Sequence, residues 1–127
     1  MISYVTIGAL DAAASVAFYD AVLGAVGYSR TFFDSGWAGY SPGGEGAQTV
    51  YLCPPFDGQP ARAGNGIMIG FAAGSREAVD AAHAAALAFG GADEGAPGPR
   101  PADSTTTYVA YMRDPTGNKL SVMWSAG

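Results

Sequence analysis

The sequence predicts an α+β fold in which two βαβββ modules join their sheets around one half-open, mixed barrel-like cup. In each half of the chain a strand-like segment precedes a helical one, and short strand-like segments with Gly- and Pro-rich turns follow. A shift of 64 residues superimposes the two expected helix starts, Asp11 and Ser75. Side-chain identity between the halves is poor, so the repeat is one of architecture. Because neither module can bury its sheet alone, a shared cup is expected.

The first half begins with a strand at residues 2–8, which is rich in β-branched residues. Asp11 is a typical N-cap, and the helix that it starts is expected to reach Val26, before the stop signal Gly27. At 100° per residue one helix face gathers the residues expected in the core: Ser15, Val16, Tyr19, Val22, Leu23 and Val26, with Phe18 at its edge. Three short strands are expected to follow, at residues 28–33, 37–41 and 48–53.

The second half repeats this plan. A strand is expected at residues 66–73, and a helix capped by Ser75 runs to about Phe89, where Gly90 and Gly91 end it. Residues 95–103 are rich in Pro and Gly and predict an irregular crossing with at most a short strand. The last two strands are expected at residues 106–113 and 119–124, joined by a β-turn. The chain is therefore expected to form one domain over residues 1–127: module 1 at about 1–53, a linker at 54–65 and module 2 at about 66–124.

Composition limits the classes of partner. The net charge is −5 with only six Lys or Arg residues, which argues against a nucleic-acid partner. No apolar run approaches the roughly 20 residues that span a bilayer. The first residues read directly as a strand, without a leader-like segment, which favours a cytoplasmic protein without a membrane partner. The single cysteine, Cys53, has no neighbouring cation or histidine in sequence and is interpreted as a buried structural thiol.

Three segments carry a family resemblance. They are the Phe18-Tyr19…Leu23-Gly24…Gly27-Tyr28 helix, the Gly66-Ile67-Met68-Ile69-Gly70-Phe71 strand and the Arg113-Asp114-Pro115-Thr116-Gly117-Asn118 turn with the strand after it. Together, at this spacing, they resemble the vicinal oxygen chelate superfamily of glyoxalase, bleomycin-resistance and dioxygenase-like proteins. The resemblance covers nearly the whole chain and implies the same cupped fold.

In metal-using members the resemblance implies a divalent ion held by one residue on each of three strands. The corresponding positions here are Tyr4, Met68 and Ser121. These are not the imidazole, carboxylate or thiolate groups that such ions prefer. We therefore expect no metal and no cofactor, which places every metal-dependent activity of the family in doubt for this chain.

Strand alternation predicts the residues that line the cup, taking the three ligand positions as facing inward. The expected lining is apolar and aromatic and consists of Tyr4, Thr6, Trp37, Tyr51, Met68, Tyr108, Met112, Ser121 and Met123. Such a surface suits a flat, hydrophobic or aromatic ligand. The alternative is that these side chains fill the space between the sheets.

Catalytic candidates are few: Tyr4, His83 and Arg100. His83, the only histidine, lies on the core side of its helix and is expected to pair with Asp80 or a backbone carbonyl. Arg100 lies in the crossing loop, where the family plan implies the cup mouth; it is either a clamp for a ligand carboxylate or phosphate or a surface ion-pair residue. Asp114 is expected to accept hydrogen bonds from the amides of Thr116 and Gly117.

Three functions from different classes remain open. The first is a metal-free protein that binds a small apolar or aromatic molecule, similar to bleomycin-resistance members. The second is a metal-independent lyase- or isomerase-like enzyme acting by proton transfer, and the third is a protein-interaction module with a vestigial cup. The resemblance also implies a homodimer, and alanine-rich outward helix faces are compatible with one: Ala13, Ala14, Ala17, Ala21, Ala81, Ala84, Ala85 and Ala88.

Overall fold

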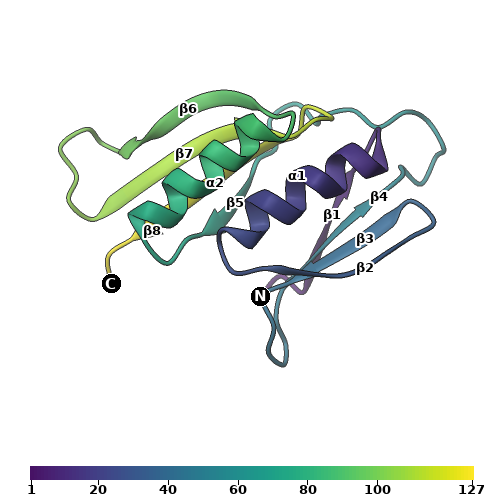
Figure 1. Ribbon diagram of the computed structural model, residues 1–127, viewed down its shortest axis with the longest axis horizontal. Helices are drawn as coiled ribbons and strands as arrows, with labels where there is room; N and C mark the ends of the chain where they lie inside the picture. Colours follow the sequence, from purple (N-terminus) through teal and green to yellow (C-terminus); the bar gives the residue numbers. More distant parts are fainter.

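Each half of the chain folds as one strand, one helix and three further strands, as the sequence predicts. The computed structural model describes residues 1–127 and places α1 over one sheet and α2 over the other (Figure 1). The elements are β1 (Tyr4–Gly8), α1 (Ala12–Gly24), β2 (Ser29–Asp34), β3 (Trp37–Ser41), β4 (Thr49–Cys53), β5 (Ile69–Ala72), α2 (Arg76–Ala88), β6 (Ala92–Pro99), β7 (Thr107–Arg113) and β8 (Lys119–Ser125).

The two sheets have the same strand order. The first sheet runs β1-β4-β3-β2 and the second β5-β8-β7-β6. In each, the strand before the helix pairs in parallel with the last strand of the module, and the other pairs are antiparallel. β1 and β5 are edge strands that form no ladder with each other, so the sheets do not close into a barrel. The α+β fold with a half-open cup is thereby confirmed.

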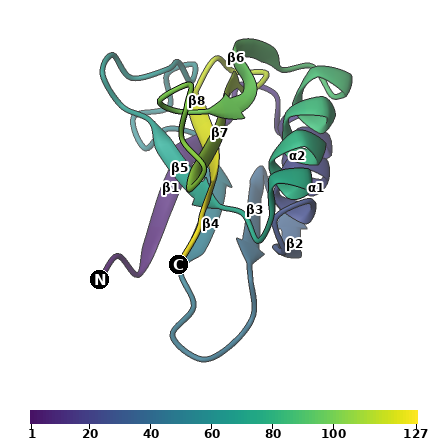
Figure 2. The same ribbon diagram turned by 90° about the vertical axis from the view of Figure 1, so that its left-hand side faces the viewer.

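Both helices lie on one side of the sheets and leave the other side open (Figure 2). Asp11 caps α1, since its Oδ1 accepts a hydrogen bond from the Ala14 amide at 3.0 Å, and Ser75 caps α2 through the Ala78 amide. The face of α1 expected in the core is buried from Ser15 to Leu23, and Val26 is half-buried. Neither helix is long and apolar enough to cross a membrane.

β6 corrects the expected irregular crossing at residues 95–103. The chain forms an eight-residue strand from Ala92 to Pro99, paired with β7. Its register shifts between Asp93 and Gly95 and again between Gly95 and Gly98. β6 is also an edge strand, so only one of its sides pairs with a neighbour. Pro and Gly are tolerated at such bulged edges, and their presence therefore did not exclude a strand.

The turn between β7 and β8 ties the two modules together. The buried carboxylate of Asp114 accepts hydrogen bonds from the amides of Thr116, Gly117 and Asn118, each at 2.9 Å. It also accepts from the hydroxyl of Tyr19 on α1 at 2.6 Å. The side-chain amide of Asn118 bonds both Asp114 and the carbonyl of Gly8 at the end of β1. The expected turn is confirmed, and it also joins module 2 to two elements of module 1.

Candidate functional site

The core defines which sheet face looks into the cup. On β1, β4 and β8 the residues that pack under the helices are Ile7, Val50, Leu52, Leu120 and Val122. Because successive strand residues point to opposite faces, their neighbours in sequence face the open side. These neighbours include five of the predicted lining residues: Tyr4, Thr6, Tyr51, Ser121 and Met123.

Tyr108 and Met112 do not belong to this lining, which corrects the sequence prediction. Tyr108 donates its hydroxyl hydrogen to Asp80 on α2 at 2.7 Å, so it points toward the helix layer. Met112 is fully buried in the core beneath the helices. The cup-facing residues of β7 are instead Val109 and Tyr111, which lie opposite Met123 and Ser121 on β8. The sequence did contain a signal for Tyr111. Alternation of the two sheet faces, counted back from Ser121 through the β7–β8 turn, places Tyr111 on the same face as Ser121.

An aromatic group covers the cup face of the first sheet. The Tyr51 ring lies 5.7 Å from Tyr4, 6.3 Å from Phe32 and 6.4 Å from Trp37 between ring centroids. Phe32 was not predicted, because a bulge between Arg30 and Phe32 changes which face β2 presents. Its ring lies over Gly39, where an added Cβ would come within 2.6 Å of it. The bare backbone of Gly39 therefore makes room for Phe32 in the group.

The large apolar side chains of the cup remain open to solvent. The exposed fractions are 59% for Tyr4, 45% for Met68, 42% for Met123, 41% for Trp37 and 40% for Phe32. Deeper in the cup, Gly70 lies beside Ser121, and an added Cβ at Gly70 would come 2.9 Å from the serine Oγ. Self-packing therefore buries Val109 and Ser121 on this face but leaves its large apolar side chains open, whereas it fills the helix side.

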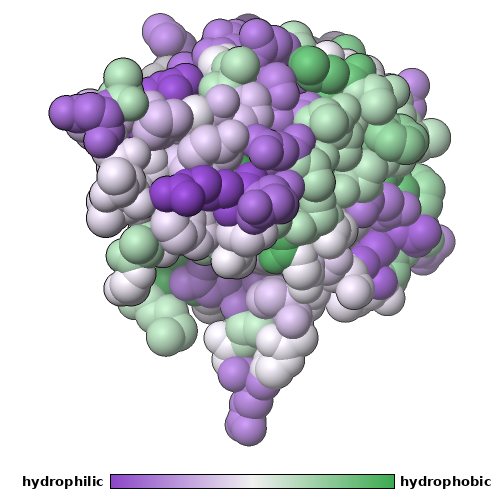
Figure 3. All heavy atoms as spheres, turned by 60° about the vertical axis from the view of Figure 1, so that its left-hand side comes forward, coloured by the Kyte–Doolittle hydropathy of each residue, from purple (hydrophilic) through white to green (hydrophobic).

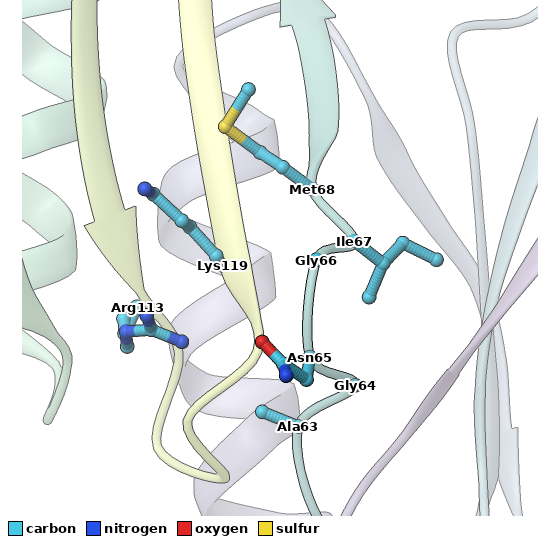
Figure 4. A pocket seen from close by; sticks show the side chains of 8 residues that line it. All are labelled: Ala63, Gly64, Asn65, Gly66, Ile67, Met68, Arg113 and Lys119. Atoms are coloured by element: carbon cyan, nitrogen blue, oxygen red, sulfur yellow. The ribbon is translucent and has the colours of Figure 1, made fainter.

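Three hollows meet at Met68. Two follow the groove between β1 and β5, each of about 230 Å³; one is lined by Tyr4, Thr49 and Gly70 among others, and the second by Thr6 and Asn118. The third, of about 540 Å³, lies between the 63–68 segment and the β7–β8 hairpin (Figure 4). Met68 thus stands where the three spaces join, and Tyr4 faces it across the groove.

The other two catalytic candidates are absent from this lining. His83 is buried between α2 and β6, and its Nε2 lies 2.9 Å from Asp93 Oδ1, so Asp93 replaces Asp80 as its partner. The hydrogen bond from His83, followed by one from the Gly95 amide, lowers the pKa of Asp93. Arg100 follows β6 directly and donates to the carbonyls of Ala96 and Pro99 on that strand. Of the three candidates, only Tyr4 reaches the cup.

Cys53 is buried at the end of β4. Burial raises the pKa of its thiol, which disfavours the reactive thiolate. The structural interpretation of this cysteine therefore fits its environment.

The donor set does not fit a catalytic metal ion. Tyr4, Met68 and Ser121 offer a phenol, a thioether and a hydroxyl, and no three His, Cys, Asp or Glu side chains gather anywhere in the structure. Ser121 lies on β8 of the second sheet, Met68 directly precedes β5 of the same sheet, and Tyr4 lies on β1 of the first sheet. The backbone arrangement expected of the three positions is therefore present, but their side chains are not suitable metal ligands.

Comparison with known proteins settles the family. The model of the Glyoxalase/Bleomycin resistance protein/Dioxygenase superfamily matches residues 1–122. The chain belongs to this superfamily. A glyoxalase/bleomycin resistance protein from Albidiferax ferrireducens T118 is 41% identical, with a TM-score of 0.87 and 98% of each chain covered.

More distant structures of the superfamily share the fold. A family enzyme from Burkholderia phytofirmans PsJN is 22% identical over 98% of each chain, with a TM-score of 0.71. A lactoylglutathione lyase from Agrobacterium tumefaciens is also 22% identical, covers 98% of this chain and 92% of its own, and has a TM-score of 0.64. A comparison with curated proteins gives no match. At this level of identity the superfamily likeness describes the fold of the chain and leaves its chemistry to its own residues.

Proposed function

We propose that this chain binds a small, partly aromatic molecule in its cup without a metal ion. The observation that carries this proposal is that Met68, at a position where the resemblance implies a metal ligand, lines three hollows, one of which is walled mainly by apolar and aromatic side chains, among them Tyr4, Tyr28 and Phe71. The hollow of about 540 Å³ lies within the range of small-molecule sites, roughly 300–1,000 Å³. Tyr4 supplies a ring to one of these hollows, and its contact with Tyr51, which in turn contacts Trp37, continues the aromatic surface beyond it.

The two alternatives find less support. Of the three catalytic candidates a proton-transfer enzyme would draw on Tyr4 alone, since His83 lies on the helix side of the sheet and Arg100 bonds the carbonyls of β6. A vestigial cup would be expected to be filled by its own side chains, whereas Tyr4, Met68 and Met123 are well exposed. Binding of a small molecule accounts for the exposed apolar side chains of the cup, which these two alternatives do not explain.

The four methionines provide a direct test, because each occupies a different environment. Met68 and Met123 face the cup, Met112 is buried under the helices and Met1 is fully exposed. Protein labelled with ¹³C at the methionine methyl groups and freed of metal with EDTA is titrated with naphthalene-1-carboxamide, 1-naphthol and indole. Saturable shifts confined to Met68 and Met123 support the proposal. No saturable shift with any probe, or equal shifts at all four methyls, would contradict it.

The same titration separates binding from catalysis. After the titration the probe is recovered and its molecular mass is measured by mass spectrometry. A binding protein returns it unchanged, whereas a metal-independent enzyme would accumulate product from a true substrate.

A further inference from the structure

One of the three hollows holds two cations, and one of these, Lys119, also lines a second hollow. The hollow of about 540 Å³ is lined by Ala63, Gly64, Asn65, Gly66, Ile67, Met68, Arg113 and Lys119, and so contains two cations, one amide and no acid. The chain has only six cations and a net charge of −5. A third of its positive side chains therefore lines one cavity in an acidic protein.

The two cations lie on neighbouring strands. Arg113 on β7 and Lys119 on β8 are direct cross-strand partners, on the same face as the Tyr111–Ser121 pair. Like charges placed directly opposite each other in a sheet are unfavourable unless something negative lies between or beside them. Figure 4 shows that the side chains of Met68 and Lys119 extend toward the same side, whereas that of Ile67 extends to the opposite side.

The two cations differ in how far the protein neutralises them. Arg113 donates through Nε to Glu94 at 2.6 Å and through a terminal nitrogen to the Gly117 carbonyl at 2.9 Å. The ammonium group of Lys119 makes no hydrogen bond or ion pair with the protein. It lies 5.8 Å from the centre of the Tyr111 ring. The chain's only lysine is therefore half-buried at the wall of an apolar cup and has no carboxylate partner.

From this geometry we infer that the ligand of the cup is an apolar or aromatic molecule that carries an anionic group, and that Lys119 binds this group. Arg113, whose charge is offset by Glu94, keeps one terminal nitrogen without a hydrogen bond to the protein, and Asn65 offers a neutral polar group. The apolar part of the ligand would lie past Met68, in the groove between β1 and β5. This inference rests on the binding function proposed above and specifies the class of its ligand.

The test compares three probes with one ring system: 1-naphthoate, 1-naphthyl phosphate and the neutral naphthalene-1-carboxamide. Affinities are read from the Met68 methyl signal at constant ionic strength. At least one anion is expected to bind about tenfold more tightly than the carboxamide, as one charge-assisted contact implies. The preferred anion identifies the group as carboxylate or phosphate.

Two variants locate the contact. Lys119→Gln should lower the affinity of the preferred anion about tenfold and leave the carboxamide unchanged. Arg62→Gln removes the same charge from the exposed linker, outside the cup, and should change neither. Equal binding of all three probes, or equal losses in the two variants, would overturn the inference and leave metal-free binding intact. If no probe binds, both proposals fail.

Discussion

Removing the Tyr19 hydroxyl tests the claim that Asp114 locks the two modules together. Tyr19→Phe deletes a buried 2.6 Å hydrogen bond between α1 of module 1 and the β7–β8 turn of module 2. A hydrogen bond to a charged group contributes roughly 1.5–3 kcal/mol. The other donors to Asp114 remain in place, so the carboxylate stays partly satisfied. We expect the free energy of unfolding to fall by about 2 kcal/mol.

Urea unfolding at pH 7 measures this loss, with thermal unfolding as a second readout. At about 4 °C per kcal/mol for a chain of this size, the midpoint should fall by about 8 °C. Tyr28→Phe is the matched control, because the half-buried Tyr28 packs against Phe71 but its hydroxyl makes no hydrogen bond to the protein. That variant should stay within about 0.5 kcal/mol of the parent, as most substitutions outside such contacts do. Equal losses of unfolding free energy in the two variants would show that the hydrogen bond from Tyr19 to Asp114 does not stabilise the fold.

Three further predictions address packing, pH and assembly. Gly91→Ala should cost about 3 kcal/mol in urea unfolding, since its Cβ would lie 2.5 Å from the Arg113 carbonyl and 2.6 Å from the Phe18 ring. Gly24→Ala, whose Cβ meets nothing within 4 Å, should instead be neutral or stabilising; a mild effect at Gly91 would contradict the packing described here. The hydrogen bond with His83 lowers the pKa of Asp93 in the folded protein. It therefore stabilises the fold above about pH 4, and this stabilisation is lost as the pH falls through the folded-state pKa of Asp93. Asp93→Asn should thus flatten the acid limb of a melting-temperature profile, and an unchanged limb would refute the coupling. The exposed alanines on α1 and α2 leave the expected homodimer a surface for close packing, and Figure 3 shows apolar side chains on the right of the molecule. Light scattering at tens of micromolar should give twice the 12.8 kDa chain mass, and the monomer mass would reject the homodimer.

Much of the fold could be predicted because its local signals agree with its packing. The N-caps Asp11 and Ser75, the buried face of α1 and the strand Trp37–Ser41 all appear where the sequence places them. The strand β6 was missed because Gly and Pro signal irregular structure in isolation. Its pairing with β7 and its bulges are tertiary features that local propensity does not contain.

The candidate site was predictable only where strand parity could be anchored. Tyr4, Met68 and Ser121 were placed by resemblance, and alternation then carried Thr6 and Met123 to the face that lies opposite the helices. Tyr108 and Met112 were assigned the wrong parity on β7, and the bulge in β2 concealed Phe32. The partner of His83 was also mistaken, because Asp93 comes from the unpredicted strand β6.

The central claim is that the cup binds its ligand without a metal ion. One comparison tests this claim most directly. The affinity of a naphthyl probe for the cup is read from the Met68 methyl signal twice, first in EDTA and then with one equivalent of Zn²⁺ or Mn²⁺. Since Tyr4, Met68 and Ser121 offer no ligand set that suits these ions, the account predicts the same affinity in both. Binding that appears only when the metal is added, and disappears on chelation, would contradict it.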